Sequence, residues 1–347
     1  MGADNPFLPH SERLFTLLNE QMQRPTSDNF DYDYDRIVSF GELLSTTLIA
    51  TYLNTQGLET QWLDARQLVR TDNTYREGHV DWTVTQKLVC NTINPYFQHR
   101  SHGIVLTQGF IAGTAENQTT TLGREGSDYS AAIMAYTLDA ECVTVWKDVP
   151  GILNADPKRF DETVQLPHIT YSEAIELAFY GASVIHPKTI KPLQNKNITL
   201  KVQSFLNPDH TPSVIDGKAD PSIERTPSYI VKDSQTLVSI SPRDYSFMNE
   251  HNLRLIFGAC DEWGIHANVI QTSALMLSFC FDHVEEKLKG FVASLHKTFQ
   301  VKYNKGLTLF TIRHYDYSYT TGDRFLEGKK VYLKQSSRST LQFVVGS

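Results

Sequence analysis

The feature that most constrains the fold of this chain is a glycine-containing loop between an apolar run and a run of small residues. Residues 103–106, GIVL, have the composition of a buried strand. Residues 119–135, TTTLGREGSDYSAAIMA, end in the small and apolar residues of a helix packed on a sheet. Gly123 and Gly126 allow backbone conformations and close approaches that a side chain would block. The pattern predicts a strand, a tight loop and a helix start.

The start of this expected helix has the chemistry of an anion-binding site. A helix N-terminus offers free backbone N–H groups and the positive end of the helix dipole to a bound anion. Arg124 adds a forked cation, and Asp128 adds a carboxylate beside it. The alternative is an ordinary turn followed by a helix that Ser127 or Asp128 caps. The loop alone leaves both interpretations open.

On both sides of this loop, segments with apolar residues at helical spacing alternate with segments that have the apolar pattern of strands. Residues 170–173, TYSE, form a capping box, which starts a helix that ends near Gly181. Such alternation predicts an α/β fold with a mostly parallel sheet covered by helices on both faces. Helices are expected at residues 11–22, 36–56 and 83–99, from the loop to residue 138, at 170–181 and after 187, and strands at 60–64, 103–106, 142–146 and 198–204.

A change of composition then divides the chain. Residues 207–228 are rich in proline and charge, which is typical of a linker between domains. The periods beyond it follow the order βαββαβ, that of a small α+β ferredoxin-like domain. Its elements are expected at residues 236–241, 249–263, 265–270, 275–281 and 284–299, with a strand after them. Strands at 307–313, 330–335 and 340–345 indicate a second copy, which is reduced because residues 314–328 are too polar and too short for the usual helix.

Composition excludes several classes of function. A formal net charge of -7, without a lysine or arginine run, argues against nucleic acid as the main partner. No apolar run approaches a membrane span, and the first residues lack the features of a signal peptide, so we expect no membrane partner and a cytoplasmic protein. The four cysteines have no metal-site spacing. Residues 28–35, DNFDYDYD, are expected to form a solvated loop rather than a metal site.

Five ordered blocks of this sequence resemble the signature series of the aspartate kinases. The loop TTLGREGSDYSAA is followed by WKDVPGILNADP at residues 146–157 and by YGASVIHPKTI at 180–190, and it is preceded by SFGELLS at 39–45 and WLDARQLVRTD at 62–72. The resemblance covers nearly the whole chain. It implies a three-layer α/β/α amino-acid-kinase fold over residues 1–212, a linker over 213–228, and a regulatory region of α+β ferredoxin-like ACT domains, one full and one reduced, over 229–347.

The resemblance also implies a reaction. Aspartate kinases transfer the γ-phosphoryl group of ATP, bound with Mg²⁺, to the side-chain carboxylate of L-aspartate, which gives 4-phospho-L-aspartate for lysine, threonine and methionine biosynthesis. Arg124 would form a bidentate pair with the α-carboxylate, and Glu42 would accept the α-ammonium group unless it is only a solvated helix carboxylate. Ser45 and Thr121 would be further contacts. Asp128 would organise a phosphate-binding lysine or the magnesium waters, with a simple N-cap as the alternative.

The nucleotide would be bound by the two later blocks. The lysine of WKD stands where the family holds the adenine and ribose side of ATP and commonly has threonine. The family's ATP-binding lysine in GAKVLHP is replaced here by Ser183, and Lys188 is a candidate to supply that charge from a slightly different direction. The positions implied to contact the nucleotide are Lys147, Asp148, Asp156, Lys158, Arg159, Ser183 and Lys188.

One departure from the family concerns its first strand and the KFGGTS loop, whose lysine and glycines hold the transferring phosphate. No such stretch occurs in these 347 residues. Loss of one such electrostatic contact commonly costs about a hundredfold or more in rate, so we expect little or no kinase activity from the chain as it stands. The alternative function is a non-catalytic amino-acid sensor or dimerisation fragment, against which the retained Arg124, Asp128 and Glu42 argue. A glutamate or acetylglutamate kinase fits less well, because those kinases lack the ACT region.

Regulation by lysine or threonine is implied by residues 263–274, WGIHANVIQTSA, which align with the effector loop and strand of inhibited relatives. ACT units pair edge to edge, so a homodimer is expected. The reduced ACT unit is expected to be completed by a strand near residues 229–231. The residues implied to hold the effector are Phe247, Met248, Asn268, Thr272 and Ser273, with a plain turn between strands as the alternative for the last two.

Overall fold

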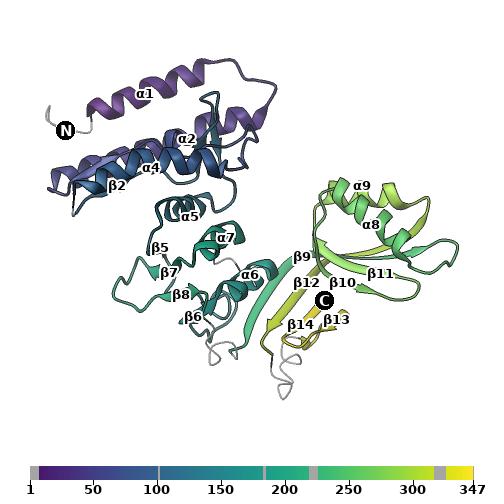
Figure 1. Cartoon of the computed structure of the whole chain (residues 1–347). Coiled ribbons are helices and arrows are strands. Elements are labelled where there is room, and N and C mark those ends of the chain that lie inside the picture. Colours follow the sequence, from purple (N-terminus) through teal and green to yellow (C-terminus); the bar gives the residue numbers. More distant parts are fainter. Residues whose placement is uncertain (1–7, 101, 183–184, 219–225, 316–325, 347) are drawn as a thin grey trace. The chain divides into compact units, whose positions relative to one another are not determined.

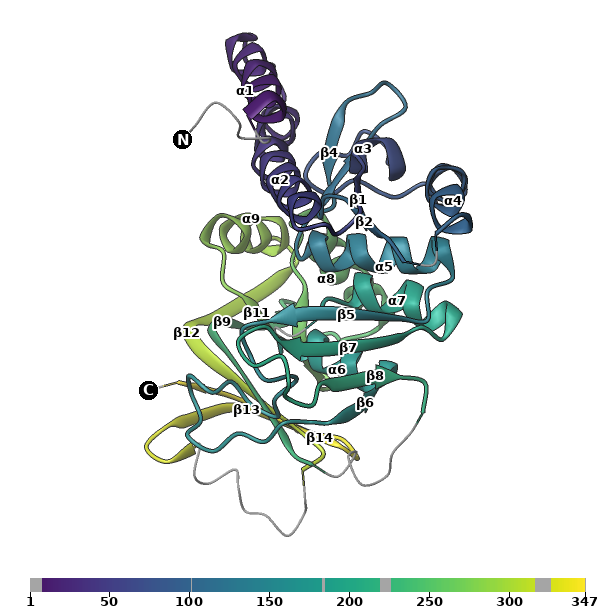
Figure 2. The same cartoon turned by 90° about the vertical axis from the view of Figure 1, so that its left-hand side faces the viewer.

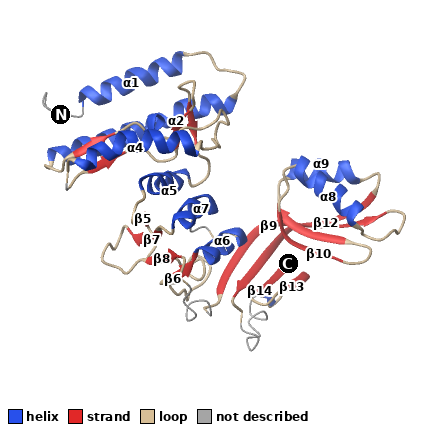
Figure 3. Ribbon diagram, viewed as in Figure 1, coloured by secondary structure: helices blue, strands red, loops and turns tan. Residues whose placement is uncertain are grey.

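The computed structural model describes residues 8–100, 102–182, 185–218, 226–315 and 326–346, and by its internal contacts the chain divides into two compact units. The first unit comprises Met1–Pro150, His168–Ile175 and Val184–Lys218. The second unit comprises Gly151–Pro167, Glu176–Ser183 and Ala219–Ser347. Figure 3 shows that the first unit mixes helices with short strands, whereas long strands dominate the second.

The first unit opens with two helices, α1 (Leu8–Gln23) and α2 (Phe30–Thr55), which lie side by side (Figure 1). Asn29 caps α2, because its side chain accepts a hydrogen bond from the Tyr32 N–H at 3.1 Å. The helix therefore begins six residues before the expected start at residue 36.

The acidic cluster at residues 28–35 thus lies mostly inside α2, and the prediction of a solvated loop is wrong. Asp35, Ser39 and Leu43 recur every four residues, and all three are buried. The helical spacing of buried residues therefore extends into the acidic cluster, and it predicts the structure of this segment better than the acidic composition does.

The main sheet of the first unit has four strands in the order β5-β7-β8-β6 (Figure 2). The pairs β5/β7 and β6/β8 are parallel, and the pair β7/β8 is antiparallel. The helices α5 and α7 pack against each other beside this sheet. These elements are β5 (Cys142–Lys147), β6 (His168–Thr170), β7 (Thr199–Ser204), β8 (Ser213–Asp216), α5 (Gly126–Leu138) and α7 (Pro187–Lys196).

Strand β8 corrects the expected linker over residues 207–228. Ile215 is wholly buried, and the Asp216 carboxylate lies 2.8 Å from the His168 Nε2 of the neighbouring strand. Four residues between prolines and charges are too few to show a strand period. The sheet partners, rather than the local sequence, determine this strand.

Smaller elements complete the first unit. Strands β1 and β2 form a parallel pair, and β3 and β4 form an antiparallel pair. Helix α6 begins in the first unit and ends in the second, and Thr170 Oγ1 accepts a hydrogen bond from the Glu173 N–H at 3.1 Å, as in the expected capping box. The elements are β1 (Thr60–Trp62), α3 (Ala65–Leu68), α4 (Trp82–Gln98), β2 (Ile104–Leu106), β3 (Ile111–Gly113), β4 (Thr119–Thr121) and α6 (Tyr171–Tyr180).

The core of the first unit lies where α4 and α5 meet α3 and the β3/β4 pair. It buries Leu68, Val69, Val89, Ile93, Ala112, Leu122 and Ile133. Burial of such aliphatic side chains is the main favourable contribution to folding. Among the helices that the structure describes, none is long and apolar enough to cross a bilayer.

The second unit is a six-stranded antiparallel sheet in the order β10-β11-β9-β12-β14-β13, with helices α8 and α9 over one face (Figure 3). Its first five elements after β9 follow the predicted order, and α8 has Asn249 as its N-cap. The structure therefore has the predicted α/β fold followed by an α+β region. The elements are β9 (Ser228–Pro242), α8 (Glu250–Glu262), β10 (Ala267–Thr272), β11 (Leu277–Asp282), α9 (Glu285–Leu295), β12 (Phe299–Arg313), β13 (Lys330–Ser336) and β14 (Thr340–Gly346).

Two long strands join the halves of this sheet. The first half of β9 pairs with the second half of β12, with Tyr229 opposite Ile312 and Val231 opposite Phe310. This pairing confirms the prediction that a strand near residues 229–231 completes the reduced half. The expected loss of a helix between β12 and β13 concerns residues that lie largely outside the described ranges.

Candidate functional site

The loop between β4 and α5 turns through two residues in the left-handed region. Gly123 has a φ of 79°, Glu125 has a φ of 53°, and α5 begins at Gly126. Glu125 is the N-cap residue and makes no side-chain cap bond. Ser127 and Asp128 lie within the first turn, so the interpretation of either as the N-cap is wrong. The Gly126 N–H donates to the Gly123 carbonyl at 3.1 Å, whereas the Ser127 and Asp128 N–H groups have no partner among the described residues and are available to an anion or to water.

A second loop lies directly on this helix start. A Cβ on Gly109 would lie 2.6 Å from the Ser127 Oγ, and a Cβ on Gly126 would lie 2.7 Å from the Phe110 Cβ. The Phe110 N–H also donates to the Ser130 Oγ at 2.9 Å. Glycine is therefore required at both positions. The sequence interpretation missed this loop, although a glycine soon after an apolar run is a signal of close backbone approach.

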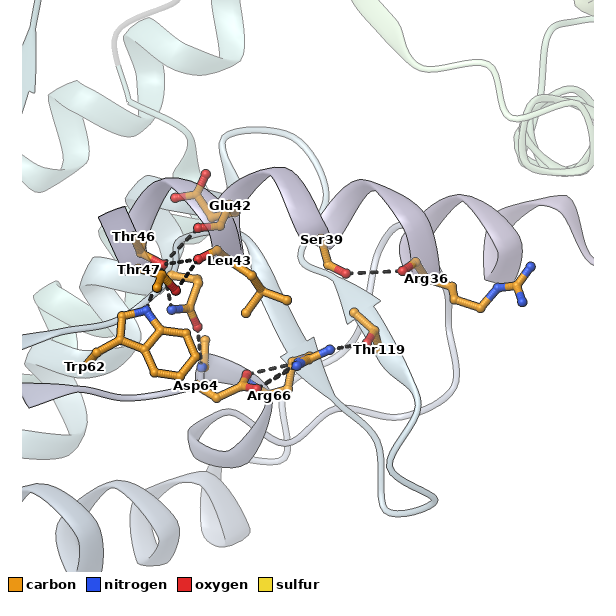
Figure 4. Close-up of polar contacts among 12 residues, drawn as sticks. Arg36, Ser39, Glu42, Leu43, Thr46, Thr47, Trp62, Asp64, Arg66 and Thr119 are labelled. Atoms are coloured by element: carbon orange, nitrogen blue, oxygen red, sulfur yellow. Dashed lines mark hydrogen bonds and ion pairs between the residues drawn. The ribbon is translucent and has the colours of Figure 1, made fainter. Parts of the chain in front are cut away.

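The two charged side chains expected to hold aspartate belong to two chain segments that both contact Phe110. Phe110 packs against the cluster that contains Phe40 and Leu43 of α2, and Glu42 lies between these two positions in the chain. Glu42 is partly buried, and Figure 4 shows its carboxylate turned away from the polar contacts on the other side of α2. Arg124 is exposed. Neither charged group has a hydrogen bond or ion pair with any residue in the described ranges.

Asp128 and Lys147 form an ion pair beside the helix start. The Lys147 Nζ lies 2.9 Å from the Asp128 Oδ2, and their side chains are only 26% and 16% exposed. Lys147 ends β5, and its carbonyl oxygen accepts a hydrogen bond from the Phe205 N–H at 2.7 Å. Within the described ranges, no group of three or more His, Cys, Asp or Glu side chains is placed to hold a metal ion. The geometry therefore presents Asp128 as the partner of a lysine.

Thr121 is held by a carboxylate that the sequence interpretation missed. The wholly buried Asp35 accepts hydrogen bonds from the Thr121 N–H and Oγ1, both at 2.8 Å, and from the Arg76 N–H at 2.7 Å. The Thr121 hydroxyl therefore donates to Asp35 and fixes the end of β4 to α2. The four-residue spacing from Asp35 to Ser39 was the available signal.

Two other expected contacts are exposed. Ser45 lies one helical turn after Glu42 on α2, and Asp148 follows Lys147 at the end of β5. Neither side chain is held by a described residue. Their roles stay predictions.

The last block of the resemblance is only partly visible, because Ser183 lies outside the described residues. The Lys188 Nζ forms an ion pair with the Glu77 carboxylate at 2.5 Å, which lowers the pKa of Glu77. His186 caps α7 by accepting a hydrogen bond from the Lys188 N–H at 3.1 Å. Burial lowers the pKa of His186, and the charges of Glu125 and Arg124 also act on it. The N-termini of α5 and α7 therefore lie close together.

The residues expected toward the phosphates belong to the second unit. The Arg159 guanidinium forms an ion pair with Asp233 of β9 at 2.5 Å, and this hydrogen bond raises the pKa of Arg159. The Asp156 Oδ1 accepts a hydrogen bond from the Lys158 N–H at 2.9 Å, and both side chains are exposed. A role for Asp156, Lys158 and Arg159 in nucleotide binding stays a prediction.

Three of the expected effector residues come together at the turn between β10 and β11. Thr272 ends β10, and the Ser273 N–H donates to the Met276 carbonyl at 2.8 Å, which is the geometry of a turn. The Met248 N–H donates to the Ala274 carbonyl at 2.8 Å. Phe247, the neighbour of Met248, is 72% exposed.

Asn268 lies four residues before Thr272 on β10, within a polar network. Its Nδ2 donates to the Gln235 Oε1 at 2.8 Å and to the Asp282 Oδ1 at 3.1 Å, and its Oδ1 accepts from the Lys232 Nζ at 2.8 Å. These contacts use both N–H donors of the side-chain amide and one lone pair of its oxygen. The structure therefore gives Asn268 a structural role, and an effector contact would have to displace one of these partners.

A family model and the curated relatives that match this chain all belong to the amino acid kinases. The model of the amino acid kinase family matches residues 9–204. The lysine-sensitive aspartokinase 3 of Escherichia coli is 30% identical over 309 residues, which are 86% of this chain and 66% of that protein. Another relative, aspartokinase 1 of Arabidopsis thaliana, is 30% identical over 80% of this chain and 50% of its own length. The chain spans about two thirds or less of the length of these curated relatives.

Solved structures are similar over nearly the whole chain. The crystal structure of E. coli aspartokinase III in complex with aspartate and ADP, in the R-state, has a TM-score of 0.82 and 27% identity, and the match covers 98% of this chain and 78% of that one. The complex of the same enzyme with lysine and aspartate, in the T-state, has a TM-score of 0.75 and 27% identity over 97% and 77% of the two chains.

Proposed function

The chain belongs to the amino acid kinase family, and from this premise we propose that it serves an aspartate kinase reaction. In that reaction the γ-phosphoryl group of ATP is transferred to the side-chain carboxylate of L-aspartate, which gives 4-phospho-L-aspartate at the first step of lysine, threonine and methionine biosynthesis. The expectation of little or no turnover by this chain itself stays a prediction. Aspartate and ADP are bound together in the related E. coli enzyme.

The observation that carries this proposal is the pair of charges, Glu42 and Arg124, that have no partner in the described ranges and lie in two segments that both contact Phe110. Arg124 offers a forked guanidinium, which matches the two oxygens of the substrate α-carboxylate. Glu42 offers a partly buried carboxylate for the α-ammonium group, and Ser45 adds a hydroxyl one turn along α2. A partly buried carboxylate without a partner, as at Glu42, favours a ligand that supplies the opposite charge.

The phosphoryl group then needs positive charge beside the acceptor carboxylate. The uncapped N-terminus of α5 supplies oriented N–H groups. Lys147 supplies a cation that Asp128 holds at 2.9 Å. MgATP is a substrate in this scheme, with Asp148, Asp156, Lys158 and Arg159 as its other proposed contacts. Between Lys147 and Lys188, the ion pair with Asp128 favours Lys147 as the lysine beside the helix start.

Regulation belongs to the same proposal. The related E. coli enzyme binds lysine in its T-state, and we infer an amino-acid effector, lysine or threonine, for the second unit here. Thr272, Ser273, Met248 and Phe247 are the proposed contacts at the β10–β11 turn, supported by the Met248–Ala274 hydrogen bond that joins these segments. A homodimer through the edge of the six-stranded sheet would place two such turns in one assembly.

The test compares Arg124→Lys with Arg100→Lys, a control that also keeps the charge, at an arginine paired with Glu59 and stacked on Tyr96. Binding of L-aspartate and of MgATP is measured by calorimetry, with a coupled assay for ADP release on the same samples. We expect Arg124→Lys to weaken aspartate binding at least about tenfold, because lysine cannot form the bidentate pair, and to leave MgATP binding unchanged.

Three results would contradict the proposal: equal aspartate affinity in the two variants, preference for L-glutamate over L-aspartate, or no aspartate binding to the parent chain. A chain that binds lysine or threonine but neither aspartate nor MgATP would instead be an amino-acid sensor.

A further inference from the structure

The loop at residues 72–79, between α3 and α4, lies against the candidate site but takes no part in the proposed function. A Cβ on Gly123 would lie 3.3 Å from the Arg76 carbonyl oxygen and 3.6 Å from the Glu77 Cγ. The Gly78 N–H donates to the Thr121 carbonyl at 2.8 Å. The loop therefore covers the turn that leads from β4 into α5.

The backbone of this loop is fixed at several points. The Asp72 Oδ1 accepts a hydrogen bond from the His79 N–H at 3.0 Å, which closes the loop at its base. The Arg76 N–H donates to the wholly buried Asp35 carboxylate at 2.7 Å. Arg76 has a φ of 62°, in the left-handed region that side chains rarely adopt. The residues on both sides of Glu77 are thus held by the first unit, so its side chain starts from a defined position.

The Glu77 side chain reaches from this loop to the start of α7. Its Oε1 lies 2.5 Å from the Lys188 Nζ, and the two side chains are 63% and 37% exposed. The hydrogen bond from Lys188 lowers the pKa of Glu77, so the carboxylate is ionised at neutral pH. An ion pair with this exposure contributes little to stability. Its main consequence is the position that it gives to the Lys188 ammonium group.

The place of Lys188 in α7 is unfavourable for the helix itself. His186 is the N-cap and α7 begins at Pro187, so Lys188 lies in the first turn. The helix dipole favours a negative charge there and disfavours a positive one. The stability of α7 therefore does not explain a lysine at this position.

Three segments that carry charged side chains converge beside Lys188. The pKa of His186 is lowered by burial, and the charges of Glu125, Lys188, Arg124 and Glu77 also act on it. These residues belong to the loop at 72–79, to the turn before α5 and to the start of α7. All three segments lie in the first unit.

Several hydrogen-bond donors at this meeting point have no partner among the described residues. A lysine ammonium group has three N–H donors, and Lys188 uses one of them for Glu77. The Ser127 and Asp128 N–H groups in the first turn of α5 are also without a partner, and Arg124 has no ion pair. Such donors suit an anion with several oxygens.

We propose that Glu77 is a positioning residue that holds Lys188 for the phosphate chain of the nucleotide. One N–H of the ammonium group stays with Glu77, and the other two bind phosphate oxygens. A lysine side chain loses much rotamer entropy when it is ordered, and Glu77 orders it before the nucleotide binds. The assignment to a nucleotide rests on the proposed function, whereas the binding of a polyphosphate anion by Lys188 does not.

The experiment measures binding to the full chain by calorimetry. The probes are MgATP, inorganic tripolyphosphate and L-aspartate, and the variants are Glu77→Gln, Lys188→Met and the double variant. The matched control is Glu59→Gln, because Glu59 pairs with Arg100 at 2.6 Å and the two side chains are 61% and 38% exposed, almost as in the Glu77–Lys188 pair. Thermal unfolding checks that each variant is folded.

We expect Lys188→Met to weaken the binding of MgATP and of tripolyphosphate about tenfold, and Glu77→Gln to weaken both about threefold. The double variant should bind as Lys188→Met does, because Glu77 acts only through the lysine. A merely structural role of Glu77 would keep its effect in the Lys188→Met background. Glu59→Gln should bind both probes as the parent does, and L-aspartate affinity should be the same in all variants.

The proposal is overturned if Glu77→Gln binds MgATP and tripolyphosphate as tightly as the parent or more tightly, or if its effect persists in the double variant. It is also overturned if the parent binds neither probe. MgATP and aspartate binding that none of these variants changes would leave the proposed function standing without this role for Glu77. If tripolyphosphate binding follows the variants but neither aspartate nor MgATP binds, Glu77 positions Lys188 for an anion and the proposed kinase function fails.

Discussion

Replacing Asp35 by alanine should cost the first unit about 3–5 kcal/mol of unfolding free energy. The carboxylate is wholly buried and accepts hydrogen bonds from the Arg76 N–H, the Thr121 N–H and the Thr121 hydroxyl, at 2.7, 2.8 and 2.8 Å. Removal strands two backbone donors and one hydroxyl, and each buried unsatisfied group costs about 1–3 kcal/mol. Entry of water into the vacated space recovers part of this sum, so the lower half of the range is expected.

Asp35→Asn removes the negative charge of the side chain but is able to keep its hydrogen bonds, so it measures the two contributions to stability separately. Its amide oxygen is able to keep both backbone N–H groups, and the Thr121 hydroxyl is able to rotate to accept from the new amide nitrogen. The expected loss is about 1–2 kcal/mol, since only the charge-assisted part disappears. The matched control is Asp31→Ala, where a side chain that is 52% exposed pairs with Arg76 at 3.3 Å, and it should change stability by less than about 1 kcal/mol.

The assay is urea unfolding followed by tryptophan fluorescence in a Trp263→Phe background, so that the remaining tryptophans report on the first unit. The order of loss should be alanine, then asparagine, then the Asp31 control. Equal effects of Asp35→Ala and Asp31→Ala would refute the reasoning, because they would mean that the buried carboxylate stabilises no more than an exposed one.

Burial raises the pKa of the Cys280 thiol to about 12, so this thiol should resist alkylation in the folded chain. The exposed Cys142 should react first. The reverse order of labelling, measured by mass spectrometry of the peptides, would contradict this prediction. Burial also lowers the pKa of His186 in the folded chain. As pH falls, the unfolded state therefore binds the proton before the folded state does. The contribution of the neutral imidazole to the free energy of unfolding is complete above about pH 6.5 and is lost as pH falls from there through the lower pKa of the folded chain. His186→Asn, which keeps the cap acceptor, should flatten the loss of stability on acidification, and an unchanged pH profile would contradict this. In the second unit, a Cβ on Gly290 would lie 2.3 Å from the Trp263 ring, so Gly290→Ala should cost about 1–2 kcal/mol despite its better helix propensity, and a stabilised variant in thermal unfolding would disprove the clash.

The residues that the sequence identified correctly are those whose signal is local. The loop around Gly123, the helix that follows it and the capping box near Thr170 each depend on neighbours within a few residues, and the structure has all three. The order of the longer helices and strands could be predicted for the same reason, because periods of apolar residues run along each of them. The short elements α3, β3, β4, β6 and β8, of three or four residues each, were missed because they are too short to show a period. The resemblance to the aspartate kinases, stated from five blocks, is confirmed by the relatives and solved structures.

The features that the sequence did not show depend on pairs that are far apart in the chain. Asp35 meets Arg76 across 41 residues and Thr121 across 86, and Arg159 meets Asp233 across 74. The spacing of apolar residues along one element gives no information about such a distant partner. The acidic cluster at residues 28–35 was therefore predicted to be a loop, and Arg159 was predicted to be available for a phosphate. The sequence by itself therefore determined the longer elements, their order and the family of this protein. Only the tertiary structure decided which charges are already paired within it and which remain free for a ligand, because long-range contacts form only when the elements pack.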